Sequence, residues 1–344
     1  MKKVIVGIII GLTVLIIALA AWYFLIKDKT QTNQNSTTPS TTPQKWSGNF
    51  IDTHAHLTAS GTTLDEVVSY LDKYHIEKII VMQTPVNIYA NMTPEQFMIP
   101  EAGETHPDRF AMMYEGEAIS LLNEIVRNGS YTPEQEELFK QQIREAAASG
   151  KYVGFGEIAL RHYAQPDAVR KEGLDITNPG DHPWLLELSD IGAQFNMPLD
   201  IHIEPDANTL PGFETLIAHN PKTKIIFDHA GWYNTGEATP ELFRNLLKKY
   251  PNLYSSIKLR KPRGEGQEKV AILDNNQKIK SDWLALFKQF PDRFTIGTDT
   301  KFGLGNSEAD AHELLGLVNT FLTQLPDDLA QKIALDNAKS IFGF

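Results

Sequence analysis

The sequence predicts an α/β protein whose body, residues 48–344, is a (β/α)8 TIM barrel that follows a single N-terminal transmembrane helix and a disordered linker. Three observations support the barrel. Short apolar segments rich in β-branched or aromatic residues are bounded by Gly, Pro, Asn or Asp, as strands are. Helical patterns fill the intervals, and strand starts recur about every 25 to 45 residues, the length of a βα unit. Eight such units over roughly 290 residues match a (β/α)8 barrel.

The first 27 residues form the predicted transmembrane signal anchor. Val4 to Ile26 is an apolar run preceded by two lysines. At a rise of about 1.5 Å per residue, such a run is long enough for a hydrocarbon core of about 30 Å. Lysines that stay in the cytoplasm place the body outside, so we expect a single-pass protein of the cell membrane with an extracytoplasmic domain. The alternative is secretion after cleavage of a signal peptide, because Ala18-Leu19-Ala20 resembles a small-residue cleavage site.

Residues 28–47 form the predicted linker, which is rich in Ser, Thr, Pro and Gln and has almost no apolar residue to bury. The body then alternates strands with helices. The predicted strands are Phe50–His54, Lys78–Met82, Arg109–Tyr114, Tyr152–Glu157, Pro198–Ile203, Lys224–His229, Leu253–Ile257 and Phe294–Thr298. The predicted helices are Leu64–Tyr74, Pro133–Ala148, Pro183–Phe195, Phe213–His219, Pro240–Tyr250, Asp282–Phe290, Glu308–Leu322 and Asp327–Ala338. An open doubly wound sheet is the structural alternative, but no glycine-rich phosphate fingerprint follows the first strand.

Charge and cysteine content exclude several functions. The whole chain has a net charge of −11, and residues 1–46 carry five lysines and one aspartate. The remaining body, residues 47–344, therefore has a net charge of −15. We therefore expect no nucleic-acid partner, because non-specific binding to nucleic acid needs a positive surface. The chain has no cysteine, which excludes disulfides, thiolate metal ligands and a cysteine nucleophile.

The segment "FIDTHAHL" places His54 and His56 on one face of the first strand, because side chains alternate with a period of two. Alone, the pair could be two hydrogen-bonded histidines of a half-buried strand. A barrel, however, gathers catalytic groups at the C-terminal ends of its strands. Further side chains that can bind a metal stand at or near four more strand ends: Glu157, His202, His229 and Asp299. Together the six residues predict a metal site, for which imidazole and carboxylate ligands suit zinc, with manganese or iron as alternatives.

This pattern of His-x-His after the first strand, His at the fifth and sixth, and Asp after the eighth resembles the amidohydrolase superfamily of metal-dependent barrels. Four further stretches resemble its amidohydrolase-related (amidohydrolase 2) branch, which includes hydrolases and decarboxylases: "HPDRFAMM", "GFGEI", "PDRFTIGTD" and "DNAKSIFGF". Glu157 in "GEIAL" also resembles the strand-four glutamate of the TatD-type deoxyribonucleases, where it joins the metal shell. The residues thus allow two metals bridged by Glu157, or one metal with Glu157 outside its ligands. The resemblance implies that His229 is a ligand or polarises the scissile carbonyl.

We expect Asp299 to be the catalytic base, because it can take the proton of a metal-activated water and return it to the leaving group. The predicted function is hydrolysis of a small ester, lactone or amide. Decarboxylation within the same family is the first alternative. A TatD-type nuclease and a barrel that has lost activity and serves as a binding module are less favoured.

Cations near the predicted mouth suggest that the small-molecule substrate carries a carboxylate or phosphate. Lys258 and Arg260 follow the seventh strand and Arg161 follows Glu157. Trp232 follows His229 and could stack on a ring. The alternative is a solvated basic loop with an aromatic residue used in packing.

Overall fold

The structure is a computed structural model, and it describes residues 46–58, 62–84, 99–114, 131–163, 176–232, 237–262, 264–303 and 308–344. The chain divides into two units, Met1–Pro43 and Gln44–Phe344, of which the first lies outside the described residues. The predicted anchor, 1–27, and nearly all of the predicted linker, 28–47, therefore lie outside them too. Within the described residues, no helix combines the length and apolarity needed to cross a membrane.

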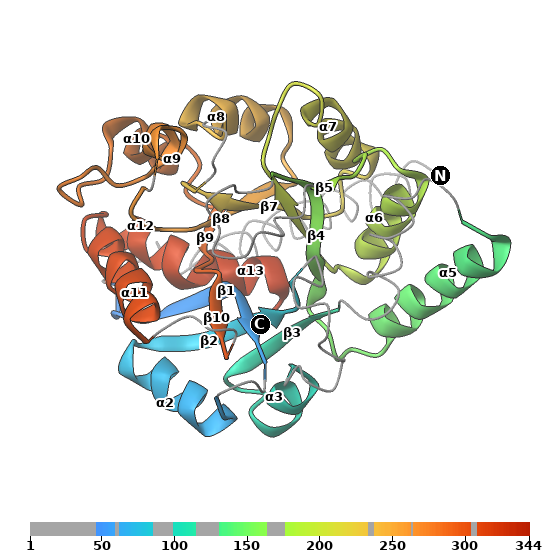
Figure 1. Ribbon diagram of the computed structural model, residues 1–344, viewed down its shortest axis with the longest axis horizontal. Coiled ribbons are helices and arrows are strands. Elements are labelled where there is room, and N and C mark those ends of the chain that lie inside the picture. The colour runs from blue at the N-terminus through green and yellow to red at the C-terminus, as the bar shows by residue number, and fades with distance from the viewer. Residues whose placement is uncertain are drawn as a thin grey trace, which may run out of the picture. The chain divides into compact units, whose positions relative to one another are not determined.

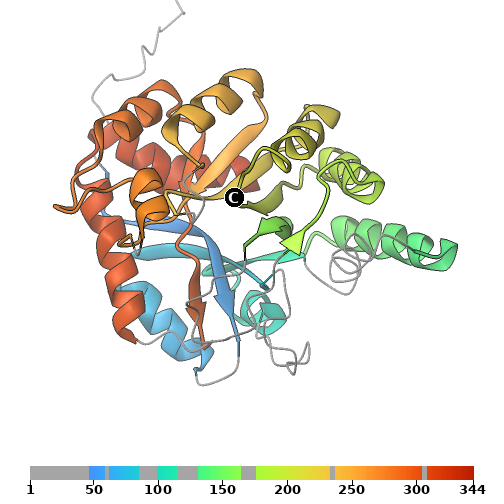
Figure 2. The same cartoon turned by 45° about the horizontal axis from the view of Figure 1, so that its top comes forward.

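Gln44–Phe344 forms a closed parallel barrel with helices around it (Figures 1 and 2). Each barrel strand pairs in parallel with the next, and Asp52 of β1 pairs with Ile296 of β9 to close the ring. The eight barrel strands are β1 (Phe50–Leu57), β2 (Ile76–Met82), β3 (Phe110–Tyr114), β4 (Gly154–His162), β6 (Leu199–Ile203), β7 (Ile225–Ala230), β8 (Leu253–Ile257) and β9 (Phe294–Ile296). The predicted barrel is confirmed.

Two short strands add to this ring. β5 (Ile176–Thr177) pairs antiparallel with the end of β4, and β10 (Thr300–Phe302) pairs with the end of β1. The eighth predicted strand, Phe294–Thr298, corresponds to the shorter β9, and β10, which the sequence did not predict, follows after residues 297–299. This interruption places Asp299 between two segments that both pair with β1.

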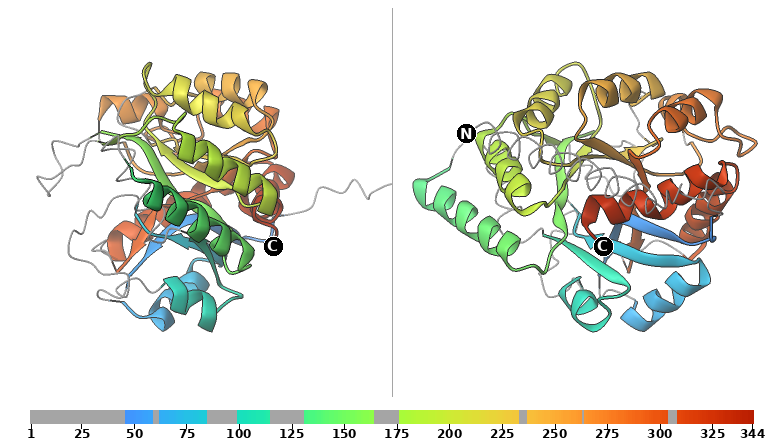
Figure 3. Two further views of the ribbon diagram at one scale, coloured as in Figure 1. Left: turned by 90° about the vertical axis from the view of Figure 1, so that its right-hand side faces the viewer. Right: turned by 180° about the vertical axis from the view of Figure 1, so that it is seen from behind.

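The helices form an outer ring, which Figure 3 shows from the side and from behind. They are α2 (Leu64–Lys73), α3 (Ile99–Thr105), α5 (Pro133–Ala148), α6 (Pro183–Phe195), α7 (Leu210–His219), α8 (Pro240–Lys249), α9 (Glu265–Val270), α10 (Ser281–Gln289), α11 (Glu308–Leu322), α12 (Asp327–Gln331) and α13 (Asn337–Phe342). The sequence did not predict α3 and α9. The single helix predicted over 327–338 is instead α12, a π-helical segment at Lys332–Asp336, and α13.

Local sequence explains where two of these helices begin. Thr63 and Glu66 form a reciprocal capping box at α2, and Thr132 and Gln135 do the same at α5. Between the helices and the strands lies a continuous apolar core. In it, Trp184 of α6 stacks on Phe139 of α5 at a ring distance of 4.5 Å. This packing fixes the outside of the barrel and leaves the strand ends to carry polar groups.

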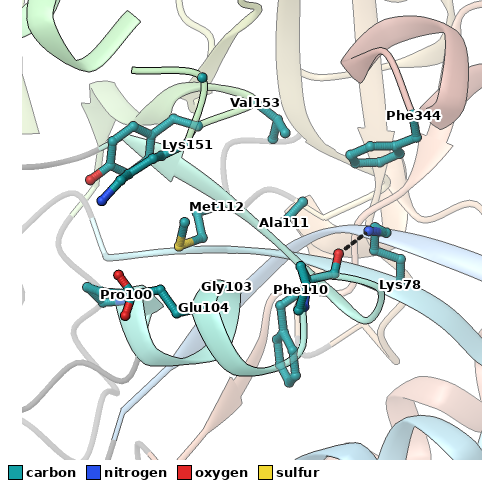
Figure 4. A pocket seen from close by; sticks show the side chains of 13 residues that line it. Lys78, Pro100, Gly103, Glu104, Phe110, Ala111, Met112, Lys151, Val153 and Phe344 are labelled. Carbon is teal, nitrogen blue, oxygen red and sulfur yellow. Dashed lines mark hydrogen bonds between the residues drawn. The ribbon is translucent and has the colours of Figure 1, made fainter. Parts of the chain in front are cut away.

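A cavity of about 380 Å³ lies where the strands begin, at the opposite end from the predicted site. It is lined by the start of β3, by α3 and by the segment before β4, with Phe344 at its edge (Figure 4). Lys78 reaches across this region and donates a hydrogen bond to the Pro107 carbonyl at 2.7 Å. None of the predicted site residues lines this cavity.

Candidate metal centre

The six predicted metal ligands converge inside the barrel, and all of them are buried, with at most 5% of each residue exposed. Glu157 lies at the centre of the group. Its Oε2 is 3.5 Å from Nε2 of both His54 and His56. Its Oε1 is 2.6 Å from His202 Nδ1 and 3.4 Å from His229 Nε2. The two carboxylate oxygens thus face two different pairs of histidines.

Breaks in strand register bring the site residues inward. Pairing of β7 with β8 shifts between Phe227 and Ala230, and His229 adopts a positive φ of 61°. Such a bulge lets consecutive residues share a face, so Asp228 and His229 both reach the interior. Asp299 has a φ of 54°, and its backbone N–H donates to the His54 carbonyl at 2.8 Å. This hydrogen bond joins the segment between β9 and β10 to β1.

The proton on His56 is placed by its surroundings. His56 Nδ1 lies 2.9 Å from the carbonyl oxygen of Met82, which can only accept, so Nδ1 donates. In a neutral ring the other nitrogen, Nε2, then carries a lone pair, and it faces Asp299 Oδ1 at 3.0 Å. Two acceptor atoms at this distance repel each other unless a cation or a proton lies between them. This arrangement suits a metal ligand pair, because the second nitrogen of a ligating histidine usually donates to a carbonyl or carboxylate.

His54 is fully buried and surrounded by carboxylates. Its Nδ1 is 3.3 Å from Asp200 Oδ1 and 3.5 Å from Asp228 Oδ1. Burial alone would lower the pKa of His54, but Asp228, Asp200 and Glu157 raise it well above its usual value. Within the described part of the chain, neither ring nitrogen of His54 makes a regular hydrogen bond. The site therefore favours positive charge at this point, which a divalent cation would supply in place of a proton.

His229, Asp299 and Glu157 have the protonation states that bind a metal ion. Burial, together with the positive charge of Lys258, lowers the pKa of His229 to about 3, so its ring is neutral at pH 7. Burial would raise the pKa of Asp299, but Lys258 and Lys301 hold it well below its usual value. The pKa of Glu157 is likewise well below its usual value, because His54, His202 and His229 outweigh burial. Neutral imidazoles and ionised carboxylates are the forms that bind zinc.

Sequence reasoning missed two acidic residues of this site. Asp200 lies two residues before His202 on the same face of β6, and Asp228 directly precedes His229. Burial and the nearby Asp228 raise the pKa of Asp200 well above its usual value. Burial opposes ionisation of Asp228, but His54 and Asp200 lower its pKa to about 2. Ser256 donates to Asp228 Oδ1 at 3.0 Å and accepts from the His229 backbone N–H at 3.1 Å. Asp200 could have been identified from the sequence, because it lies two residues before His202 on the same strand. Asp228 could not, because it points inward only as a result of the bulge between β7 and β8.

Glycine permits close approach at this level of the barrel. A Cβ on Gly297 would lie 2.7 Å from Ser256 Cβ and 3.1 Å from His54 Cβ. A Cβ on Gly156 would lie 2.6 Å from Asp200 Cβ. Both glycines therefore let neighbouring strands approach beside the buried donors.

Two of the four predicted substrate-binding residues lie together with Asp299. Lys258 is 1% exposed, forms an ion pair with Asp299 Oδ2, and lies 3.6 Å from the centre of the Trp232 ring. Burial and the charges of Arg260 and Lys301, only partly offset by Asp299, lower the pKa of Lys258 to about 7. Arg260 lies farther out, 5.8 Å from the Trp232 ring. Aromatic and cationic groups thus line one side of the candidate metal centre.

Arg161 is placed differently. Its Nη1 donates to the carbonyls of His162 and Ile176, at 3.1 and 2.8 Å, and its guanidinium lies 3.5 Å from the centre of the Tyr163 ring. Asp206 lies 3.6 Å from Arg161 Nε. These contacts tie β5 and the end of β4 together. A role for Arg161 in substrate binding stays a prediction.

Comparison with known proteins identifies the family of this chain. A family model described as amidohydrolase (Amidohydro_2) matches residues 51–344. The chain belongs to the amidohydrolase family. It is accordingly a metal-dependent hydrolase by class, and the predicted relationship is confirmed. A search of curated proteins found no match.

The chain is also similar to solved structures of low sequence identity. An apo structure of Agrobacterium tumefaciens ATU3138 is 15% identical with a TM-score of 0.49, over 88% of this chain and 96% of that one. A zinc-bound amidohydrolase from Burkholderia multivorans is 14% identical with a TM-score of 0.47, over 86% and 99% of the two chains. A 4-oxalomesaconate hydratase from Rhodopseudomonas palustris is 12% identical with a TM-score of 0.48, over 86% and 95%.

Proposed function

We propose that this amidohydrolase is a membrane-anchored, extracytoplasmic enzyme that hydrolyses a small anionic ester, lactone or amide. The observation that carries the proposal is the pair of acceptor atoms His56 Nε2 and Asp299 Oδ1, which face each other at 3.0 Å inside a buried set of donors. Such a pair needs a proton or a cation between its members, and a cation there would bind both atoms at once.

The donor set suits two divalent cations, with zinc favoured and manganese or iron as alternatives. His54, His56 and Asp299 would hold one cation together with Glu157 Oε2. His202 and His229 would hold the other with Glu157 Oε1. The separation of the two oxygens of Glu157 between two histidine pairs supports this assignment. Bound there, such a cation lowers the pKa of a water molecule towards about 7 and polarises a carbonyl group.

The chain's own residues supply the proton transfers. Asp299 is ionised and belongs to the donor set, so it can accept the proton of the attacking water and deliver it to the leaving group. The neutral ring of His229 either binds the second cation or donates to the substrate carbonyl. Lys258 keeps Asp299 ionised through their ion pair. An anionic substrate that attracts Lys258 would weaken this pair and leave Asp299 a stronger base.

The cations around Asp299 support an anionic substrate. Lys258 lies against the Trp232 ring, Arg260 lies 5.8 Å from the centre of that ring, and Lys301 Nζ is 3.9 Å from Asp299 Oδ1. The buried carboxylate of Asp299 thus has two lysines beside it, and Arg260 lies near the aromatic neighbour of Lys258, so a carboxylate or phosphate of the substrate would find cationic partners there. The Trp232 ring offers an apolar surface to the same molecule.

The cellular location rests on the sequence of residues 1–27. Full-length chain expressed in cells should stay in the membrane fraction, and its barrel should be digested by protease added outside. Release into the medium would instead support the cleaved signal peptide, and protection from protease would contradict the extracytoplasmic location.

The hydrolase activity can be tested with the full-length chain in detergent, loaded with Zn²⁺ or Mn²⁺. Esters, lactones and amides that carry a carboxylate or phosphate should be hydrolysed, whereas their neutral analogues should react more slowly. A chelator should abolish turnover and added metal should restore it. Carbon dioxide release from aromatic acids in place of hydrolysis would support the decarboxylase alternative, and a metal-loaded chain inactive in both assays would refute the proposal.

A further inference from the structure

A second group of donors lies beside the candidate metal centre. His162 ends β4, and Glu204 directly follows β6. These two strands are neighbours, with Arg161 paired to Ile203 and Ala159 paired to His202. His162 Nδ1 lies 3.1 Å from Glu204 Oε1 and 3.2 Å from His202 Nε2. Three donor atoms from three residues are therefore close enough to share one ion.

His202 contacts Glu157 and His162 through different nitrogens. Its Nδ1 lies 2.6 Å from Glu157 Oε1. At this distance an ionised carboxylate accepts a hydrogen bond, so Nδ1 carries the proton. A neutral imidazole has one N–H and one lone pair. When the ring of His202 is neutral, Nε2 therefore has a lone pair, which is directed away from Glu157 and towards His162 and Glu204.

We call His162 Nδ1, His202 Nε2 and Glu204 Oε1 the outer group, and the donors around Glu157 the inner donors. One N–H cannot form full hydrogen bonds to both other atoms of the outer group. If His162 Nδ1 donates to Glu204, its single N–H has to be shared with His202 Nε2. Glu204 is 0% exposed, its Oε1 accepts the Tyr163 backbone N–H at 3.1 Å, and its Oε2 has no hydrogen-bond partner among the residues that the structure describes. A buried carboxylate with an unused oxygen needs positive charge nearby. A cation would meet all three donor atoms at once.

We propose that His162, His202 and Glu204 form a further site for a divalent transition cation such as Zn²⁺. Two imidazoles and a carboxylate are a common zinc ligand set. The side chain of His162 is 26% exposed, so the site opens towards solvent and can exchange its ion. This site is distinct from the donors around Glu157, although it shares His202 with them.

Sharing His202 couples the two sites. A neutral imidazole binds one metal ion, because its second nitrogen keeps a proton. A cation on His202 Nε2 leaves Nδ1 protonated and bonded to Glu157, as seen here. A cation on Nδ1 leaves Nε2 protonated and excludes the outer ion. Excess Zn²⁺ that binds Nε2 should therefore keep His202 from binding a cation together with the inner donors. If the proposed hydrolysis holds, this excess should inhibit the enzyme.

The direct test measures binding and needs no turnover. The full-length double variant His54→Ala/His229→Ala loses inner donors and keeps the outer three. After dialysis against graded Zn²⁺, elemental analysis should find one ion bound per chain. Adding Glu204→Gln should weaken this binding by about 100-fold, because a charged ligand is lost. Adding His219→Ala, which removes an exposed histidine paired with Asp190, should change nothing.

A folded double variant that binds no Zn²⁺, or binds it equally well after Glu204→Gln, would overturn the proposal. If the double variant does not fold by circular dichroism, Co²⁺ titration of the wild-type chain and His162→Ala decides instead. In the wild-type chain, Co²⁺ absorption should rise in two phases, and the phase of weaker binding should be missing from His162→Ala. Identical titration curves for the two chains would overturn the proposal. A wild-type chain with no tight ion at all would instead refute the proposed function.

Discussion

Asp52 lies beneath the candidate metal centre and gives a prediction whose size follows from the structure. Its carboxylate is 1% exposed and accepts three hydrogen bonds, from the backbone N–H groups of His54 and Thr298 and from the Thr298 hydroxyl. Burial outweighs these bonds and raises the pKa of Asp52 from 3.8 to about 6. The free energy linked to this shift is about 3 kcal/mol.

The sign follows from proton uptake. Because the pKa is higher in the folded state, stabilisation by the protonated carboxyl is complete below pH 3.8 and is lost as the pH rises through 6. At pH 7 the folded state therefore holds an ionised carboxylate that costs about 3 kcal/mol relative to the protonated form. Asp52→Asn removes this titration. The amide fits the same contacts, because Thr298 can accept from Nδ2 and donate to Thr300, 2.7 Å away.

The assay is urea unfolding of the chelator-treated full-length chain between pH 4 and 8. Asp52→Asn should be more stable than the wild-type chain by up to about 3 kcal/mol at pH 7, and the difference should shrink towards pH 4. The exposed Asp108→Asn serves as the matched control and should follow the wild-type curve. Parallel pH profiles for the wild-type chain and Asp52→Asn would refute the reasoning.

Three further predictions concern the site and the core. His54→Ala should lose both bound metal and turnover, measured by elemental analysis and hydrolysis, and retention of both would contradict its assignment as a ligand. Lys258→Met should raise KM for anionic substrates by about 10- to 100-fold, the value of a charge-assisted hydrogen bond, and an equal change for neutral analogues would count against the anion site. Trp184→Ala should destabilise the barrel by about 3–5 kcal/mol in urea unfolding, because the ring is buried against Phe139. A loss below 1 kcal/mol would show that the helices repack freely.

The order of strands and helices could be read from the sequence, because each depends on a local pattern. Alternation along β1 places His54 and His56 on one face, and the Thr132–Pro133 pair marks the start of α5. The barrel then follows from the number and spacing of its units. The convergence of six donors also follows, because parallel strands in a barrel end at one rim.

The sequence by itself thus determined the fold class, the family and the residue types of the metal centre. Only the tertiary structure decided which nitrogen of each histidine faces which oxygen, since this depends on contacts between distant strands. The Met82 carbonyl places the proton of His56, and the bulge at His229 brings Asp228 inward. Likewise, Glu204 and His162 are 42 residues apart in number and meet only because β4 and β6 are neighbours. Local patterns fix the elements, whereas burial and pairing across the barrel fix the chemistry.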